Sequence, residues 1–390
     1  MTFDETQHQA INLAILSRFA IITGGAGTGK TTLVKAIADE TKRPLLCAPT
    51  GKAAARLREA TGYEARTIHS MLKYNGKGFM INSLDGEHVI VDESSMVDSS
   101  LMAEIVIRKP TALTLVGDNA QLFPVGSGAP FHDLIDIKPE TVANLTTCYR
   151  SSEAVCAAGN KVRAGEFPGY DKESENERWR FLKAKNPDEA SQILLSMVES
   201  GEIDFSQDII ICPKNGERDK IHGTYPACTV NGLNPVIQDM VNPHELGGRF
   251  DVGDRVICGK NFADEDVWNG TTGVVASVDQ RDHIWVKTDT PTRDTDDPDT
   301  YREQVKFNGE MTKATRHAYA LTIHKAQGSQ YRKVIVLCLK RDNMMLSRPL
   351  LYTAITRAQK ECVVIGERWA FDKALENMPK RKTVMREISR

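Results

Sequence analysis

The run with the clearest chemical meaning lies near the start of the chain, where glycines lead into a lysine and threonines. It fits the pattern G-x-x-x-x-G-K-[ST] and follows an apolar run, residues 19–22. Glycines let successive backbone N–H groups turn toward one anion, and a helix starting near Lys30 adds its positive dipole end. Lys30 would reach the β- and γ-phosphates of a nucleotide, and Thr31 would hold Mg²⁺. The residues predicted to bind this cofactor are Gly25, Gly27, Thr28, Gly29, Lys30, Thr31 and Thr32.

A second set of polar side chains, Asp92 and Glu93, ends the apolar run 89–91. In an ATPase with a phosphate loop, such an aspartate supports Mg²⁺ and the glutamate polarises the attacking water. We therefore predict that Thr31 and Asp92 form a metal site and that Glu93 is catalytic. Gln121 follows a third apolar run, and its amide would either sense the γ-phosphate or orient the water. With Lys30, these three side chains form the predicted catalytic set.

Such groups need strands that end at one edge of a sheet, and the first part of the chain alternates strand and helix patterns. The strand-like runs are residues 19–23, 44–48, 88–92 and 112–117. One helix is predicted to open at Lys30, and another to cover 52–59 and to end at Gly62. Asn75-Gly76, flanked by aromatic and apolar residues, predicts a small β-hairpin within residues 73–87.

A second α/β pattern occupies roughly residues 150–245 and resumes near 313. Its strand-like runs are residues 208–212, 334–339 and 362–365. The interruption is all-β in character, with short strands predicted at 255–258, 273–278 and 284–286. Asn269-Gly270 marks a turn there, and residues 288–300 form an acidic loop. The pattern predicts a small barrel inserted into the second domain.

Bulk composition restricts the class of protein. A chain of 390 residues with 26% charged residues is long enough for two or three globular domains. No apolar run approaches the length of a membrane span, and the start of the chain lacks a signal-peptide pattern. The eight cysteines include no C-x-x-C pair, which favours a reducing cytoplasm. Because the net charge is −2, a polyanionic partner would need a local groove.

Read together, these motifs resemble the superfamily 1 helicases, and more narrowly the RecD-like group of superfamily 1B. The resemblance starts from Gly-Asp-x-x-Gln at residues 117–121, which follows Asp-Glu-Ser-Ser-Met-Val-Asp at 92–98. Further stretches resemble the family's motifs Ia, Ib, IV, V and VI in order, and they are Cys47–Ala54, Thr67–Leu72, Tyr149-Arg150, Ala320–Ser329 and Leu351–Ala358.

The resemblance implies an α/β fold with two RecA-like parallel-sheet domains. Domain 1A would span residues 1–148, with the hairpin at 73–87 as a 1B pin. Domain 2A would comprise 149–245 and 313–390. The interruption, 246–312, looks like the group's SH3-like 2B barrel.

Further site residues follow from the resemblance. Arg150 and Arg357 would clamp phosphoryl oxygens across a cleft, with structural ion pairing as the alternative role. Gln7 resembles a motif that recognises adenine, and Gln327 and Gly328 would face the nucleotide. The residues expected to contact DNA are Thr50, Lys52, Thr67, His69, Phe123, Thr322 and His324, with Tyr74 and Phe79 separating strands. The threonines could instead be helix N-caps, and Phe123 could fill the core. Phe123-Pro124 and Gln330 depart from the family pattern, which has Pro-Pro and often Glu at these places.

By resemblance, the chain would be an ATP- and Mg²⁺-dependent DNA helicase that moves 5′→3′ on single strands and unwinds forked duplex. We expect it to act as a monomer away from membranes, with single-strand-binding, replication or recombination proteins as partners. Two alternatives stay open. One is a DNA-stimulated ATPase that remodels protein–DNA complexes without useful unwinding, and the other is a motor subunit of a larger assembly.

Overall fold

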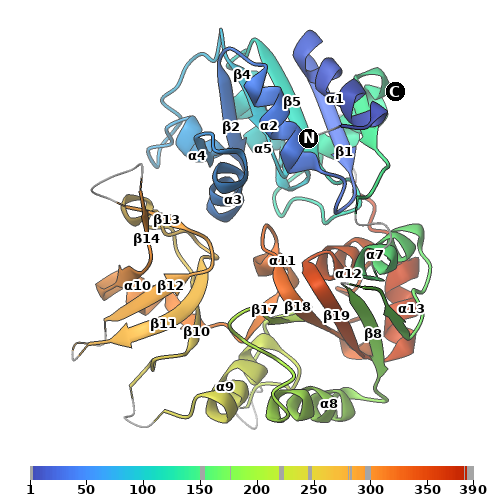
Figure 1. Ribbon diagram of the computed structural model, residues 1–390, viewed down its shortest axis with the longest axis vertical. Helices are drawn as coiled ribbons and strands as arrows, with labels where there is room; N and C mark the ends of the chain where they lie inside the picture. The colour runs from blue at the N-terminus through green and yellow to red at the C-terminus, as the bar shows by residue number, and fades with distance from the viewer. Residues whose placement is uncertain are drawn as a thin grey trace. The chain divides into compact units, whose positions relative to one another are not determined.

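The computed structural model describes residues 3–149, 154–175, 177–218, 224–244, 248–279, 281, 283–294, 300–381 and 383. The chain forms two compact units, the first being Met1–Ser152 with Pro379–Arg390 and the second Glu153–Met378. Figure 1 shows a sheet with flanking helices in each unit. Among the described residues, no helix combines the length and apolar character that crossing a bilayer requires.

The first unit is built on a six-stranded parallel sheet with the order β3-β2-β4-β5-β1-β6. Its strands are β1 (Phe19–Gly24), β2 (Pro44–Ala48), β3 (Ala65–Thr67), β4 (His88–Val91), β5 (Ala112–Gly117) and β6 (Val142–Leu145). Its helices are α1 (Glu5–Leu16), α2 (Lys30–Asp39), α3 (Gly51–Thr61), α4 (Ile68–Met71), α5 (Ser99–Val106) and α6 (Pro130–Ile137), with short 3₁₀ turns η1 (Ser94–Met96) and η2 (Pro139–Thr141).

Alternating side chains of these strands fill two cores, one on each face of the sheet, because successive strand residues point to opposite faces. Ile22, Ile90 and Val116 pack against helices α1, α2 and α3. Their neighbours Ile21 and Val91 pack on the other face with residues of α4, α5 and α6. The continuous apolar runs in the sequence are therefore explained by burial on both sides. The four strands predicted for this domain are confirmed, as is the stop of α3 at a glycine.

The predicted hairpin at 73–87 is reduced to a tight turn. Tyr74 and Phe79 form a single antiparallel bridge, and Gly76 has a φ of 89°. Beyond Phe79 the chain turns back, since the backbone N–H groups of Met80 and Ile81 donate to the carbonyl of Leu72 at 3.2 and 3.3 Å. That return stops the two arms from extending into a ladder.

The second unit contains another six-stranded sheet, ordered β17-β9-β18-β19-β8-β7 and parallel except for the β7–β8 pair. Its strands are β7 (Asp171–Glu173), β8 (Arg178–Lys183), β9 (Ile209–Cys212), β17 (Ala320–Thr322), β18 (Tyr331–Cys338) and β19 (Ala358–Gly366). Its helices are α7 (Ala154–Ala164), α8 (Pro187–Glu199), α9 (Val230–Val241), α11 (Ile323–Ala326), α12 (Arg348–Ile355) and α13 (Arg368–Glu376), with the 3₁₀ turn η4 (Lys340–Asp342).

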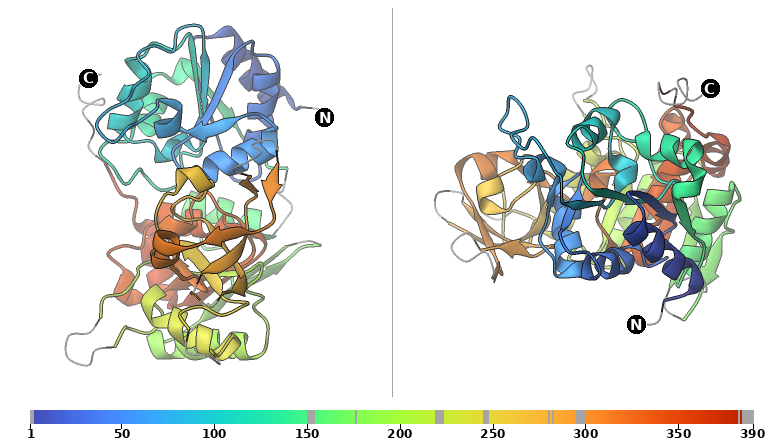
Figure 2. Two further views of the ribbon diagram at one scale, coloured as in Figure 1. Left: turned by 90° about the vertical axis from the view of Figure 1, so that its left-hand side faces the viewer. Right: turned by 90° about the horizontal axis from the view of Figure 1, so that it is seen from above.

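Between α9 and β17 the chain makes a separate five-stranded antiparallel sheet with the order β15-β12-β11-β10-β16. This inserted sheet has its own apolar core, and Figures 1 and 2 show its orange strands apart from the parallel sheet of the same unit. Its elements are β10 (Arg255–Cys258), η3 (Ala263–Glu265), β11 (Thr272–Val278), β12 (Ile284–Thr288), β15 (Val305–Phe307), α10 (Gly309–Ala314) and β16 (Thr315–His317), with the small pair β13 (Thr292–Arg293) and β14 (Tyr301–Arg302) beside it.

Three predicted boundaries move. Strand β16 pairs with β10, so the inserted sheet extends to His317 and the end predicted at residue 312 is wrong. Tyr149 belongs to the first unit, where its backbone N–H donates to Gly27 at 3.1 Å. The segment from Pro379 groups with the first unit as well, not with domain 2A. There Arg381 donates to the carbonyls of Pro124 and Gly128 at 2.6 and 2.8 Å.

Candidate nucleotide site

The glycine-rich loop joins β1 to α2 at the carboxyl edge of the first sheet. Gly27 and Gly29 have φ values of 78° and 80°, in the left-handed region where a side chain would be strained. At Gly24 an added Cβ would lie 2.7 Å from Thr28 Oγ1 and 2.9 Å from Leu145 Cβ, so only glycine fits. Thr28 is buried, and its hydroxyl donates to Gly25 O at 2.9 Å. These contacts hold the loop in a closed curve before α2 begins.

Lys30 lies inside that curve. Its ammonium donates to Gly24 O at 2.8 Å and to Gly25 O at 2.9 Å. Thr31 and Thr32 follow it, half-buried in the first turn of α2. A lysine held by two loop carbonyls can exchange these partners for phosphate oxygens without moving its backbone, which is the behaviour predicted for this residue.

The two predicted carboxylates follow β4. The Asp92 backbone N–H donates to Cys47 O at 2.9 Å, and Asp92 Oδ1 accepts from the Glu93 N–H at 2.8 Å. Burial and the neighbouring Glu93 carboxylate raise the pKa of Asp92 to about 6, although Lys30 and Arg56 oppose the rise. Two carboxylates this close favour a bound cation, since it would offset their repulsion.

Glu93 has an unusual backbone. Its φ is 50° and its ψ is 37°, and it caps the 3₁₀ turn η1. Left-handed conformation is uncommon for a residue with a long side chain, and such outliers gather at functional sites. This backbone conformation turns the chain away from β4 directly after Asp92 and Glu93.

Gln121 lies on the loop after β5 and is also buried. Its Nε2 donates to Asp118 Oδ2 at 3.5 Å, and its backbone N–H donates to Asp118 O at 3.2 Å. Since β4, β5 and β1 are neighbours in the sheet, the loops that follow them end at one edge. The structure therefore brings Lys30, Asp92, Glu93 and Gln121 to the same edge of one sheet, as predicted.

Gln7 lies against the glycine-rich loop. Its Nε2 donates to Thr28 O at 3.2 Å, and its Oε1 accepts from the Tyr149 hydroxyl at 2.7 Å. Asp4 completes the arrangement as the N-cap of α1, with Gln7 in a capping box. The amide is thus oriented beside the predicted nucleotide site, and recognition of adenine stays a prediction.

Arg357 lies in the second unit and is buried, with 4% of its surface exposed. Its Nε donates to Thr353 O at 3.1 Å, Nη1 to Ser329 O at 3.3 Å and Nη2 to Thr356 Oγ1 at 3.3 Å. Within the described part of the chain no carboxylate pairs with it, so the alternative of a structural ion pair has no partner there. Arg150, the other predicted arginine, lies outside the described residues.

Gln327 and Gly328 follow the short helix α11 of the second unit, and both are buried. Gly328 has a φ of 72°, which lets the chain turn from α11 into β18. Ser329 follows them and accepts from Arg357, so these two predicted nucleotide-facing residues lie next to the predicted arginine.

The three threonines predicted to contact DNA all cap helices. Thr50 accepts from Ala53 N at 3.2 Å, Thr67 from Ser70 N at 3.0 Å and Thr322 from Lys325 N at 3.3 Å. The capping role left open by the sequence is therefore present in each case. Helix N-termini also bind phosphate, so DNA contact stays a prediction for these residues.

The other predicted DNA-contact residues differ in exposure. His69 and His324 are exposed, whereas Lys52 is buried within α3. Phe123 is half-buried, and its ring centroid lies 4.6 Å from that of His132. For strand separation, Tyr74 is exposed and Phe79 half-buried, with ring centroids 4.9 Å apart.

Two supporting residues were not predicted. Asp118 orients Gln121, and Tyr149 orients Gln7 through its hydroxyl. Asp118 was visible as the aspartate three residues before Gln121 at a strand end. Tyr149 lies in the stretch that resembles motif IV, but its contact with Gln7 left no local signal, because the two residues are far apart in the chain.

Two family models match the chain. The model described as an AAA domain matches residues 2–183, and a UvrD-like helicase C-terminal domain matches residues 317–365. These matches include the glycine-rich loop and both carboxylates in the first case, and Gln327 and Arg357 in the second.

Among curated relatives, the ATP-dependent RecD2 DNA helicase of Deinococcus radiodurans is 31% identical over 94% of this chain. The RecBCD enzyme subunit RecD of Mycolicibacterium smegmatis is 29% identical over 98%. The chain spans 49% of the first protein's length and 74% of the second's.

The fold is similar to solved structures titled Pif1 helicase. The Bacteroides protein in complex with ADP-AlF3 and single-stranded DNA has a TM-score of 0.58 at 19% identity, covering 97% of this chain and 95% of that one. The Candida albicans protein has a TM-score of 0.52 at 19% identity, covering 100% and 99%. The two domain matches and the RecD relatives thus make the chain similar in sequence to the RecD-like group of the superfamily 1B helicases, and the solved structures show a similar fold.

Proposed function

We propose that this chain is an ATP- and Mg²⁺-dependent DNA motor that moves 5′→3′ along single-stranded DNA and unwinds forked duplex. The observation that carries the proposal is the convergence of Lys30, Asp92, Glu93 and Gln121 on one sheet edge. Lys30 would bind the β- and γ-phosphates, and Glu93 would polarise the attacking water. A Mg²⁺ ion held by Thr31 and Asp92 would neutralise charge on the phosphates during transfer.

The buried guanidinium of Arg357 supports an ATPase role for the second unit. A buried charge without a carboxylate partner is costly unless an anion completes its environment. Phosphoryl oxygens match the planar fork of an arginine. Arg357, with Gln327 and Gly328 beside it, is therefore assigned to the nucleotide rather than to fold stability.

The partner classes follow from this assignment. Single-stranded DNA would contact the exposed His69 and His324 and the helix N-termini near them. These groups would bind the phosphates of the DNA backbone. The Pif1 helicase of the solved complex binds single-stranded DNA, and RecD is a subunit of the RecBCD enzyme. For this chain we propose action as a monomer, with replication or recombination proteins as partners. All eight cysteines are free, which is consistent with a reducing cytoplasm.

Duplexes that carry only a 5′ or only a 3′ single-stranded tail test the proposal. We expect strand separation of the 5′-tailed duplex alone, dependent on ATP and lost in EDTA. Lys30→Ala should remove both ATP hydrolysis and unwinding, while Lys35→Ala, a change at an exposed ion pair on the same helix, should retain them. Unwinding of the 3′-tailed duplex instead would contradict the polarity.

A second candidate function is a translocating ATPase with little unwinding of its own. It is favoured by the turn at 73–87, since the proposed pin has a single bridge and little rigid length. We take residues 73–87 as the pin and the inserted sheet as the SH3-like 2B domain. Replacing residues 74–80 with a short Gly-Ser link should then leave DNA-stimulated ATPase nearly intact and reduce unwinding steeply. Unchanged unwinding would move strand separation elsewhere, and joint loss would make the segment part of the domain core.

A further inference from the structure

The side chain of Asp254, outside the nucleotide site, accepts hydrogen bonds from several groups at once. It is fully buried just before β10. Its Oδ2 accepts from His244 Nε2 at 3.0 Å, from His317 Nε2 at 3.1 Å and from the Asp251 backbone N–H at 2.9 Å. Its Oδ1 accepts from Tyr319 and Asn242, both at 2.9 Å. Two imidazoles therefore converge on one carboxylate oxygen.

These side chains come from both ends of the insertion. Asn242, His244 and Asp254 lie where the chain leaves α9 and enters the inserted sheet. His317 ends β16 and Tyr319 precedes β17, where the chain returns to the parallel sheet. The cluster thus ties together the two segments by which the inserted sheet is attached.

The donor set and its spacing fit a transition metal. His244, Asp254 and His317 each offer one ligand atom, and these atoms all lie within 4.8 Å of one another. Tetrahedral zinc with bonds of about 2.0–2.1 Å places its ligand atoms about 3.3 Å apart. The carboxylate oxygen already lies at nearly that distance from both nitrogens. Two imidazoles and one carboxylate are a donor set that suits Zn²⁺ and not Mg²⁺.

We propose that His244, Asp254 and His317 form a binding site for a divalent transition metal such as Zn²⁺, with water as the fourth ligand. Each imidazole now donates from Nε2. On binding, each Nε2 gives up its proton, to Nδ1 of the same ring or to solvent, and offers its lone pair to the metal without any redox change. The metal takes the place of the two hydrogen bonds to Oδ2.

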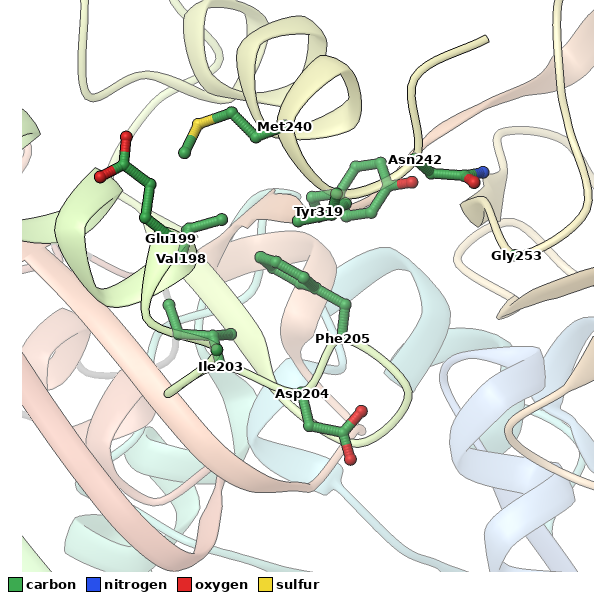
Figure 3. Close-up of a pocket in the computed structure, with 11 residues that line it drawn as sticks. Val198, Glu199, Ile203, Asp204, Phe205, Met240, Asn242, Gly253 and Tyr319 are labelled. Atoms are coloured by element: carbon green, nitrogen blue, oxygen red, sulfur yellow. The ribbon is translucent and has the colours of Figure 1, made fainter. Parts of the chain in front are cut away.

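Outer contacts for such a site are already in place. Tyr319 and Asn242 hold Asp254 Oδ1, which fixes the carboxylate so that Oδ2 faces the histidines. His244 and His317 have side chains 18% and 22% exposed, so a hydrated ion can reach them from solvent. Figure 3 shows Tyr319 and Asn242 side by side at the wall of a pocket of about 680 Å³.

The expected consequence is mechanical. A metal bound to residues from both attachment segments would cross-link them and hold the inserted sheet at a fixed angle to the parallel sheet of its unit. The site is separate from the glycine-rich loop in the sequence and the fold. Its test therefore needs no nucleotide and does not depend on the proposed motor function.

The full chain, stripped of metal with EDTA and transferred to buffer without Mg²⁺ or nucleotide, is titrated with ZnCl₂ by calorimetry. We expect one Zn²⁺ per chain and a thermal unfolding midpoint that rises with zinc concentration. Co²⁺ in place of Zn²⁺ should give the intense visible absorption of a tetrahedral site. His317→Gln should weaken zinc binding more than about 100-fold, and Tyr319→Phe by about 10–100-fold.

His283→Gln is the matched control, because His283, just before β12, pairs with Asp279 at 3.0 Å and has no second histidine beside it among the residues that the structure describes. It should bind zinc like the parent chain. His244→Gln, outside any strand or helix, provides a second ligand variant if His317→Gln does not fold by circular dichroism. Zinc affinity no tighter than millimolar, or affinity unchanged in the ligand variants that fold, would overturn the proposal.

Discussion

The two six-stranded sheets share a feature at one edge and differ in the middle. Edge strand β3 runs into Thr67-Ile68-His69, and edge strand β17 runs into Thr322-Ile323-His324. In both, the threonine caps a four-residue helix and the histidine is exposed. This repeated Thr-Ile-His turn was missed in the sequence, because three residues are too short to register as an internal repeat.

The central strands carry different chemistry. In the first sheet β1 and β4 lead into the glycine-rich loop and the carboxylates, whereas in the second sheet the buried Arg357 directly precedes β19 and lies at the start of a central strand. If the proposed function is correct, contact with the DNA backbone is duplicated, while nucleotide chemistry is divided between acids on one sheet and an arginine on the other. Three sets of variants test this division, beginning with the largest expected effect.

Glu93→Gln tests the role proposed for the carboxylates of the first sheet in ATP hydrolysis. The change keeps the size of the side chain and removes the charge that polarises water, so turnover of ATP should fall by about 10²–10⁴-fold. Nucleotide binding, measured by fluorescence titration, should survive. Glu64→Gln, at an exposed ion pair with Arg66, should leave both unchanged. Equal loss of binding would place Glu93 in metal binding or folding.

Arg357→Lys tests the role proposed for the arginine of the second sheet in ATP hydrolysis. It keeps the positive charge and loses the planar fork, so kcat should fall by about 10²-fold with a smaller rise in the KM for ATP. Steady-state ATPase assays with saturating single-stranded DNA separate these two parameters. If kcat were unchanged while the unfolding midpoint dropped, Arg357 would be a structural residue and the division would fail.

His69→Ala and His324→Ala test whether the Thr-Ile-His turns of the two sheets both contact DNA. Each should weaken single-stranded DNA binding by about fivefold, as expected for the loss of one contact of about 1 kcal/mol. His8→Ala removes an exposed histidine from α1 and should have no effect. Fluorescence anisotropy with a labelled oligonucleotide measures all three. A large effect of one histidine and none of the other would show that the two turns are not equivalent in function.

The sequence predicted the parts of the molecule whose signals are local. Strands β1, β2, β4 and β5 are apolar runs, and each is followed by residues that are predicted to bind nucleotide or DNA. The phosphate loop needs glycines at fixed places, so its conformation could be predicted as well. Both sets depend on near neighbours in the chain.

What could not be predicted depends on distant partners. Strand β16 has no apolar pattern of its own and exists because β10 pairs with it. The turn at 73–87 is an exception, since its partners are close in the chain: it fails to extend because the N–H groups of Met80 and Ile81 donate to the Leu72 carbonyl, and no residue type signals that contact. The cluster around Asp254 joins the segment that enters the inserted sheet to the segment that leaves it, and these are far apart in the sequence. Contacts between residues that are far apart in the chain produce no regular spacing of residue types, so they could not be predicted from the sequence.

The left-handed backbone of Glu93 has a consequence for how this protein can change. A glycine there would relieve strain of about 1 kcal/mol, so Glu93→Gly should raise the unfolding midpoint while stopping turnover. Stability and activity are then opposed at a single residue. A library of variants screened only for heat resistance would accumulate inactive chains at this position, and a screen for activity is what keeps the glutamate there.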